Sequence, residues 1–186
     1  FDPRLLPTIA LAVAKAAMES GVATRPVDLD AYEKNLQGQV FRSFGVMRRV
    51  FDAARAAKRR VVFAEGEDER VLRTAQAMRE DIGVTPILIG RPEVVDNRIE
   101  REGLKLVRGR DFDLVNPEND PRYRDYWQSY HSLMRRRGVT PDLAKMVLRS
   151  NTTAIAAVMV HRGEADSMIC GTFGEYRWHL NYVSQV

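Results

Sequence analysis

The residues best suited to chemistry lie in the stretch MICGTFGEYRWHLNYV, which spans residues 168–183. Its first residues are typical of a buried strand, Gly171 and Gly174 predict a turn, and the aromatic-rich remainder predicts a helix. A turn from a parallel strand into a helix is a common location for a phosphate or a catalytic group. Phe173 and Tyr176 are nevertheless unusual residues for binding an anion. The pattern therefore leaves open an active site, a ligand site without chemistry, or packing.

The side chains around this turn do not favour a nucleophilic mechanism. His179 lies near the glycines, but no serine or cysteine nucleophile with a matching acid accompanies it. His131 and His161 stand alone, and no histidine has a partner at metal-ligand spacing. His161 ends an apolar helical segment and is expected to be structural. We therefore assign no catalytic residue and no metal ligand to this chain.

A second strand-to-helix turn, AEGEDER, spans residues 64–70. Glu67, Asp68 and Glu69 would repel a phosphate, but they suit the positive end of the helix dipole. The chain contains no G-x-G-x-x-G stretch, so it has no dinucleotide fingerprint. We expect favourable helix electrostatics at this turn rather than a phosphate cradle.

Arg135, Arg136 and Arg137 end a predicted helix. Cations stabilise the C-terminal end of a helix whatever their function. Guanidinium groups are also well suited to bidentate phosphate binding. The sequence leaves both interpretations open.

Four aromatic residues recur at helical spacing just before these arginines. This spacing is more typical of packing or of an oligomer interface than of a stacking site. We take the row as the candidate surface for self-association: Tyr123, Tyr126, Trp127 and Tyr130.

The elements that position these residues alternate regularly from residue 60 onward. Helices are expected between and after short apolar strands, with Thr140 and Asn151 as helix caps. Such alternation predicts an α/β fold with a mostly parallel sheet. The expected strands lie within residues 60–66, 85–90, 112–117 and 166–171.

The part of the chain before residue 60 has a different sequence pattern, without alternating strands. Asp2 and Pro3 predict a helix start, and Gly21 predicts its end. Pro26 indicates an extended connector, and a second helical region is expected over about 29–58, with breaks at Gly38 and Gly45. This material predicts a helical tail and linker. The first helix carries one apolar stripe: Leu5, Leu6, Ile9, Val13 and Ala17.

Composition limits the possible functions. The 186 residues give room for one domain or slightly more. The net charge is +4, and the basic residues are dispersed without a nucleic-acid module. No apolar run approaches the roughly 20 residues that cross a bilayer. The only cysteine, Cys170, excludes an internal disulfide framework. We expect a cytoplasmic protein without nucleic-acid or membrane partners.

The order of several segments resembles phosphate acetyl/butyryl transferases: RVVFAEGEDERVLRTA, TPILIGRP, MRRRGVTPDLA and GEADSMICG. The opening stretch, FDPRLLPTIALAVAKAAMESGVATRP, is similar to the last helix of bacterial malic enzymes. The two occur together in hybrid NADP-dependent malic enzymes. The resemblance implies a malic-enzyme helix at 1–26, a helical linker at 27–59 and the first part of a transferase-like domain at 60–186. It also implies a three-layer α/β/α fold of the phosphotransacetylase and isocitrate dehydrogenase type.

The chain departs from the transferase pattern at the glycine turn. In the family, this turn follows a pattern like G-A-x-x-[ST]-T-A-D-x-x-R-P. Aligned from Gly171, Tyr176 takes the position of the second hydroxyl residue and Trp178 that of the acid. Asn181 replaces an arginine that would hold phosphate groups, and Tyr182 replaces the proline. The resemblance therefore implies a former catalytic turn that has lost its chemistry.

The resemblance implies a regulatory and oligomerisation segment of an NADP-dependent malic enzyme, which oxidatively decarboxylates malate to pyruvate. In such hybrids this domain senses acetyl-CoA. NADP and Mg²⁺ or Mn²⁺ would bind the malic part, outside this chain, and the parent would be a homo-oligomer. The alternatives are an active phosphate acetyltransferase, which moves acetyl between CoA and phosphate, and a segment that only drives oligomerisation. The candidate effector-binding residues are Arg135, Arg136 and Arg137 for the phosphates, and Thr172, Phe173, Tyr176 and His179 for the acyl or pantetheine end.

Overall fold

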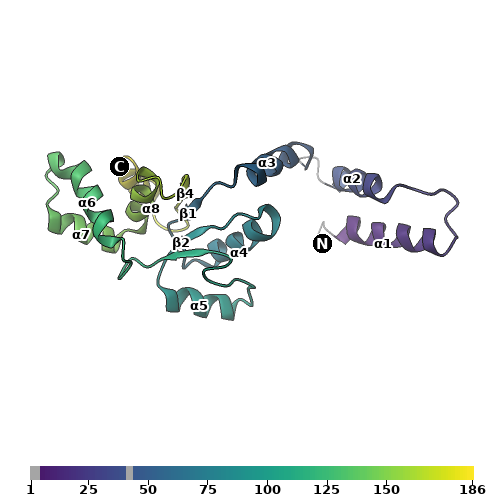
Figure 1. The fold of residues 1–186 in the computed structure, drawn as a ribbon, viewed down its shortest axis with the longest axis horizontal. Coiled ribbons are helices and arrows are strands. Elements are labelled where there is room, and N and C mark those ends of the chain that lie inside the picture. The colour runs from purple at the N-terminus through teal and green to yellow at the C-terminus, as the bar shows by residue number, and fades with distance from the viewer. Residues whose placement is uncertain (1–4, 41–43) are drawn as a thin grey trace. The chain divides into compact units, whose positions relative to one another are not determined.

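The computed structural model describes residues 5–40 and 44–186 (Figure 1). The chain forms two compact units, residues 1–56 and 57–186, and each is described by itself. The division that we expect at residues 26 and 59 stays a prediction.

The first unit is helical, with α1 (Leu5–Glu19), α2 (Leu29–Val40) and most of α3 (Phe44–Ala57). Helix α1 packs against α2 and ends as expected, with Gly21 at a φ of 72°. The breaks predicted at Gly38 and Gly45 are wrong, because both glycines lie within helices. The predicted start at Asp2 and Pro3 lies outside the described residues.

The apolar stripe of α1 is largely exposed in this unit. Ile9 is 58% exposed and Val13 is 62% exposed. Together with Tyr32 of α2, the stripe lines an apolar groove of about 500 Å³. The amphipathic pattern therefore predicts the helix correctly, while its apolar face is only partly covered by α2.

The second unit is built on a four-stranded sheet in the order β3-β2-β1-β4. All three strand pairings are parallel, with Val62 opposite both Ile87 and Met168. The chain thus adds β2 and β3 on one side of β1 and then crosses to place β4 on the other side. The four expected strands are confirmed, as β1 (Val61–Phe63), β2 (Ile87–Ile89), β3 (Asp113–Val115) and β4 (Ser167–Ile169).

Helices cover both faces of this sheet, which confirms the three-layer α/β/α architecture (Figure 1). Successive strand residues point to opposite faces. Val62 packs in a core with α6, α7 and α8, whereas Phe63 packs in a second core with α4 and α5. The helices of this unit are α4 (Glu69–Ala77), the π-helical turn η1 (Met78–Ile82), α5 (Pro92–Arg101), α6 (Tyr123–Met134), the 3-10 turn η2 (Arg135–Arg137), α7 (Pro141–Ser150), α8 (Thr152–His161) and α9 (Tyr176–Val183).

Local capping explains where several helices begin. The Asp68 carboxylate accepts a hydrogen bond from the backbone N–H of Arg70 at the start of α4. The Thr140 hydroxyl accepts one from the backbone N–H of Leu143 at the start of α7. Asn151 is the N-cap of α8 as predicted, but its side chain makes no capping hydrogen bond. Among the described residues, no individual helix is long and apolar enough to span a membrane, although α7 and α8, bent by 109°, meet that test as a pair.

The tyrosine row of α6 packs inward rather than forming a free surface. Tyr126 is 1% exposed and Tyr130 is 2% exposed, and both belong to the core between α6 and α8. Tyr123 and Trp127 are half-buried against the same core. The predicted self-association surface is therefore wrong, and packing accounts for the spacing. The structural role predicted for His161 is also wrong, because its side chain is exposed.

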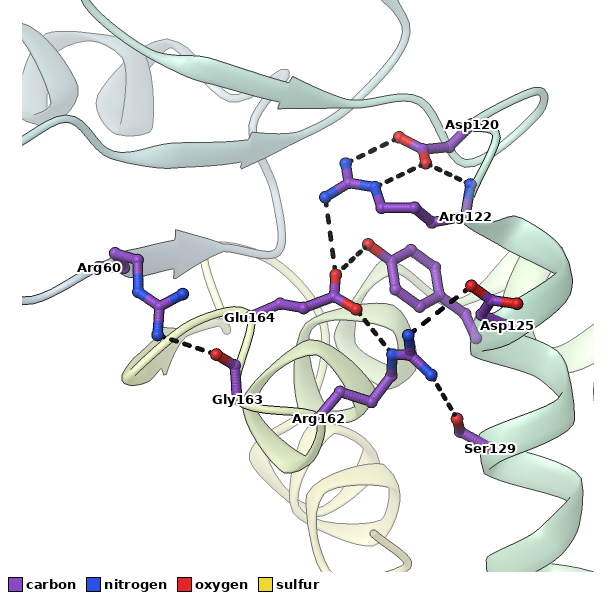
Figure 2. Close-up of polar contacts among 9 residues, drawn as sticks. Arg60, Asp120, Arg122, Asp125, Ser129, Arg162, Gly163 and Glu164 are labelled. Atoms are coloured by element: carbon purple, nitrogen blue, oxygen red, sulfur yellow. Dashed lines mark hydrogen bonds and ion pairs between the residues drawn. The ribbon is translucent and has the colours of Figure 1, made fainter.

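A polar network holds α6 against the turn between α8 and β4 (Figure 2). The Tyr126 hydroxyl donates to the Glu164 carboxylate at 2.7 Å, and the Arg162 Nε donates to the same carboxylate at 2.6 Å. The Arg122 and Arg162 guanidinium groups lie 5.7 and 5.8 Å from the Tyr126 ring centroid. Burial, reinforced by the hydrogen bond to Glu164, raises the pKa of Tyr126.

Candidate ligand-binding site

A pocket of about 420 Å³ lies where the turns that follow the four strands meet the start of α8. Its walls include Glu65 and Asp68 after β1, Arg91 after β2 and Phe173 after β4. Because the chain leaves β1 toward β2 but reaches β4 on the opposite side, a topological switch lies between β1 and β4. Ligands of open parallel sheets bind at such switches, outside the carboxyl ends of the strands.

The turn after β1 approaches β2 very closely. The backbone N–H of Gly66 donates to the carbonyl of Ile89 at 2.9 Å. A Cβ at Gly66 would lie 2.8 Å from the same carbonyl oxygen and 2.8 Å from the Leu88 Cβ. Glycine is therefore required here by space, and it brings the acidic turn up against the pocket.

Two of the pocket's acidic side chains are neutralised by arginines. The Arg91 guanidinium donates two hydrogen bonds to the Glu67 carboxylate, both at 2.9 Å. This contact lowers the pKa of Glu67 despite partial burial. Asp68 receives the backbone N–H and the guanidinium of Arg70, and the hydrogen bond from that guanidinium lowers the pKa of Asp68. The expectation of helix-stabilising electrostatics at this turn agrees with these contacts.

A buried polar cluster lies behind the glycine turn. Glu65 is 6% exposed, and its carboxylate accepts the backbone N–H of Gly171 at 3.1 and 3.2 Å. His179 is 4% exposed, and its Nε2 lies 2.7 Å from the carbonyl oxygen of Phe173. Its Nδ1 lies 2.9 Å from the hydroxyl of Thr153, which is fully buried. Both ring nitrogens of His179 and the carboxylate of Glu65 are therefore occupied by contacts within the protein.

Cys170 sits between β4 and this turn as the free thiol of the chain. Burial raises the pKa of this thiol, and the nearby Glu65 charge adds to the effect. A raised pKa keeps the sulfur protonated near neutral pH, and the thiol is not the nucleophilic form. Among the described residues, no cluster of His, Cys, Asp and Glu could hold a metal ion.

Arg149 is a basic residue of the pocket wall that the sequence did not predict as part of the site. Its guanidinium lies 5.1 Å from the Tyr123 ring centroid, and its Nε donates to the Tyr123 hydroxyl at 3.3 Å. Within the part of the chain that the structure describes, Arg149 forms no ion pair with a carboxylate. Only its position near the end of α7, three residues before the start of α8 at Thr152, could have indicated this role, and that signal is weak.

The structure separates the predicted effector residues. Arg135, Arg136 and Arg137 are exposed in η2, and none of them lines the pocket. Phe173 does line it, whereas Tyr176, which is 76% exposed, lines a separate pocket of about 360 Å³ beside Cys170 together with His179. The Thr172 carbonyl accepts a hydrogen bond from Arg70 at 2.6 Å, and the buried His179 packs behind the turn.

The layers, the parallel sheet and the pocket at its switch define a phosphotransacetylase-type α/β fold. The chain superposes on the EutD phosphotransacetylase from Staphylococcus aureus with a TM-score of 0.64 and 24% identity, covering 75% of this chain and 42% of that one. A phosphotransacetylase from Streptococcus pyogenes gives a TM-score of 0.62 and 24% identity, with 74% and 42% covered. Residues 45–186 match the family described as "Phosphate acetyl/butaryl transferase", and the chain belongs to that family.

Full-chain similarity extends to malic enzymes. The chain is 56% identical to an "NAD-dependent malic enzyme" of Rhizobium meliloti (strain 1021), over 100% of this chain and 24% of that protein. It is 51% identical to an "NADP-dependent malic enzyme" of Escherichia coli (strain K12), over 100% and 25%. A "Phosphate acetyltransferase" of Synechocystis sp. (strain ATCC 27184 / PCC 6803 / Kazusa) is 30% identical over 72% of this chain and 20% of that protein. The chain thus spans about a quarter of the length of these malic enzymes and agrees with a malic enzyme and transacetylase hybrid.

Proposed function

We propose that this chain is a regulatory and assembly-forming segment of a cytoplasmic, homo-oligomeric malic enzyme, and that its pocket binds acetyl-CoA without transferring the acetyl group. The parent would oxidatively decarboxylate malate to pyruvate with NADP and Mg²⁺ or Mn²⁺, bound outside this segment. The support is the similarity along the whole chain to proteins named malic enzymes, combined with membership of an acyltransferase family.

One observation carries the proposal: the pocket measures about 420 Å³, and the three acidic side chains that follow β1 in its wall, Glu65, Glu67 and Asp68, are already engaged. Glu67 and Asp68 are paired with arginines, and Glu65 accepts the backbone N–H of Gly171, whereas the exposed Glu118 is the further carboxylate in the pocket wall. General acid–base catalysis needs a group that is within reach of the substrate and free to exchange its proton. Binding and turnover use different groups, so a ligand pocket can persist after its catalytic residues are lost.

The ligand would find both apolar and cationic contacts. Phe173 offers an apolar wall for the acyl or pantetheine end, and Arg149 offers a phosphate a guanidinium that contacts Tyr123 but forms no ion pair with a described carboxylate. Arg135, Arg136 and Arg137 remain our proposed contacts for CoA phosphates that lie away from the pocket. All three are exposed. Ligand binding regulates only if it favours one conformational state over another.

The alternative is a working phosphate acetyltransferase, as the Synechocystis relative is named. It would need a free acid or base in the pocket. Two assays on the full-length parent separate the proposals. In the first, malate oxidation with NADP and Mg²⁺ is followed while acetyl-CoA is titrated. In the second, acetyl transfer from acetyl phosphate to CoA is measured.

We expect acetyl-CoA to change malate turnover and the transfer assay to show no turnover above an empty-vector control. Malate turnover that ignores acetyl-CoA would contradict the sensor proposal and leave an architectural role. Clear acetyl transfer would favour the alternative. The 186-residue chain by itself is expected to be inactive in both assays.

A further inference from the structure

The turn that contains Phe173 is held in place by hydrogen bonds between its backbone and side chains, and not by the backbone hydrogen bonds of the sheet. It lies between the end of β4 at Ile169 and the start of α9 at Tyr176. Gly171 and Gly174 have φ values of 102° and 84°, a region that favours glycine. The turn is therefore a short, conformationally permissive segment whose shape depends on what its backbone groups contact.

Three side chains make those contacts. The Glu65 carboxylate accepts the backbone N–H of Gly171, and Arg70 donates to the carbonyl of Thr172 at 2.6 Å. The His179 Nε2 reaches the carbonyl of Phe173 at 2.7 Å. Of these three, only the His179 contact involves the residue whose ring lines the pocket.

The chemistry of this contact determines the tautomer of His179. A carbonyl oxygen can only accept, so Nε2 must carry the proton. In the neutral imidazole Nδ1 is then an acceptor, which matches the Thr153 hydroxyl at 2.9 Å. The ring is 4% exposed and packs edge-on against Trp178, with centroids 4.7 Å apart. Hydrogen bonds and packing thus hold the imidazole in one orientation.

This arrangement disagrees with the sequence-based prediction that His179 contacts the acyl or pantetheine end of the ligand. Since the ring is buried and both nitrogens are occupied, it is not placed to touch a ligand in the 420 Å³ pocket. A Cβ at Gly174 would lie 3.4 Å from the His179 Nε2, so the ring packs directly beneath the turn. Any movement of the imidazole would be transmitted to the Phe173 carbonyl.

We propose that His179 is a positioning residue, which acts through the Phe173 carbonyl to hold the Phe173 wall of the pocket in its ligand-binding shape. This inference rests on the proposed acetyl-CoA site. Fixing a binding loop in advance improves affinity because less ordering remains to be done when the ligand arrives.

A double-mutant cycle in the full-length parent tests the proposal. Acetyl-CoA affinity is measured calorimetrically for the parent, His179→Ala, Phe173→Ala and the double variant. We expect His179→Ala to weaken binding about ten-fold, but less than about two-fold when Phe173 is already alanine, because residues that act through each other are not additive. Equal effects of His179→Ala in both backgrounds, or no effect in either, would overturn the proposal.

Two further variants separate positioning from general damage. The amide N–H of glutamine can donate to the Phe173 carbonyl, so His179→Gln is expected to keep affinity within about three-fold of the parent. His161→Ala removes an exposed histidine elsewhere and should change nothing. If His179→Ala fails to fold, His179→Gln still tests the positioning role. A loss of acetyl-CoA affinity in His179→Gln as large as that in Phe173→Ala would show that a donor to the Phe173 carbonyl is not enough to hold the turn, and it would overturn the proposal.

A measurement without ligand distinguishes failure of this inference from failure of the acetyl-CoA proposal. Amide hydrogen exchange across residues 171–174 is compared between the parent and His179→Ala. We expect faster exchange in the turn by about ten-fold and unchanged exchange in β1, because local opening raises exchange only where protection is lost. If the parent binds no acetyl-CoA but the turn still loosens, the site assignment fails and the positioning role stands. An unchanged turn overturns the positioning role whatever the ligand result.

Discussion

At the residue scale, two sets of arginines are candidates for binding phosphate, and mutation separates them. Arg149 lies at the pocket and forms no ion pair within the described part of the chain. A lost charge-assisted contact costs about 1.5–3 kcal/mol, so Arg149→Ala in the full-length parent should raise the acetyl-CoA concentration needed for half effect by about ten-fold or more. The triple alanine change at Arg135, Arg136 and Arg137 is expected to have a similar effect through other phosphates of the ligand.

The matched control is Arg124→Ala, an exposed arginine of α6 outside the pocket. Malate turnover without acetyl-CoA should stay nearly unchanged in every variant. A triple variant that responds like the parent would show that these arginines only form a solvated helix end. A normal response of Arg149→Ala would remove the pocket from consideration as the phosphate site.

Glu67 gives a prediction for stability against pH. The Arg91 hydrogen bond lowers the pKa of Glu67, so the folded state binds the proton more weakly than the unfolded state. The stabilisation is present above the unfolded pKa and is lost as the pH falls through the folded pKa. Glu67→Gln should lower Tm by about 3 °C at pH 7, and the difference from the parent should shrink below about pH 4. Thermal melts check this, with the exposed Glu100→Gln as the control.

A difference in Tm between Glu67→Gln and the parent that stays constant from pH 7 to pH 3 would show that the carboxylate charge does not contribute. The loss would then come from geometry alone. A control variant that changes as much as Glu67→Gln would point to net charge rather than to the pair with Arg91.

At the element scale, the network around Glu164 should anchor α6 to the turn before β4. Tyr126→Phe removes the hydroxyl that donates to Glu164 while keeping the buried ring. Hydrogen bonds to charged groups contribute about 1.5–3 kcal/mol, but Glu164 keeps Arg162 as a donor, so we expect a loss of about 1–2 kcal/mol in the free energy of unfolding. Urea unfolding measures it, with Tyr182→Phe as a matched control. Equal stability of Tyr126→Phe and the parent would mean that the arginines alone hold this junction.

Much of the element pattern follows from local signals. The four strands and the cap at Thr140 come from apolar runs and from a side chain that bonds to its own backbone, whereas the three layers were expected from the family resemblance. Local signals do not predict features that depend on contacts with residues far away in the sequence. Helical spacing groups the tyrosines of α6 on one face, but it cannot tell whether that face meets a core or solvent. Glycine lowers helix propensity by only about 1 kcal/mol, so Gly38 and Gly45 remain within helices.

The candidate site was harder to predict than the fold. The glycine turn was found because its residue types are unusual. The pocket itself joins segments that are far apart along the chain, so the distance between Arg149 and Phe173 has no local signature. The adjacent arginines at 135–137 suggested an anion site because clustering is visible in a sequence. Arg149, which stands alone, gave no such signal.

At the scale of the whole molecule, one edge of the sheet has no neighbouring strand among the described residues. β4 is an edge strand, and Ile169 is 49% exposed on it. Trp178 and Leu180 of α9 are also 39% and 45% exposed. An open edge beside apolar side chains favours association. We therefore expect the isolated 186-residue chain to self-associate, or to depend on the rest of the parent for stability.

Sedimentation velocity over a range of concentrations tests this expectation. Ile169→Lys places a charge on the edge strand and should reduce association, whereas Met146→Lys on α7, where the residue is 59% exposed, should not. A strictly monomeric chain that unfolds cooperatively at high concentration would contradict the expectation. Equal reduction by both lysine variants would indicate a general effect of charge.

The placement of β4 beside β1, on the side opposite to β2, has a consequence for the order in which the protein folds during synthesis. The contact between Glu67 and Arg91 spans 24 residues, whereas the contact between Glu65 and Gly171 spans 106. Loop closure becomes more costly with length, and contacts of high sequence separation form slowly. On the ribosome, β1, β2 and β3 emerge well before β4, so three strands can pair early. The Phe173 wall is then added after the walls contributed by β1, β2 and β3, and we expect the nascent chain to gain affinity for a ligand only after residue 179 has left the exit tunnel.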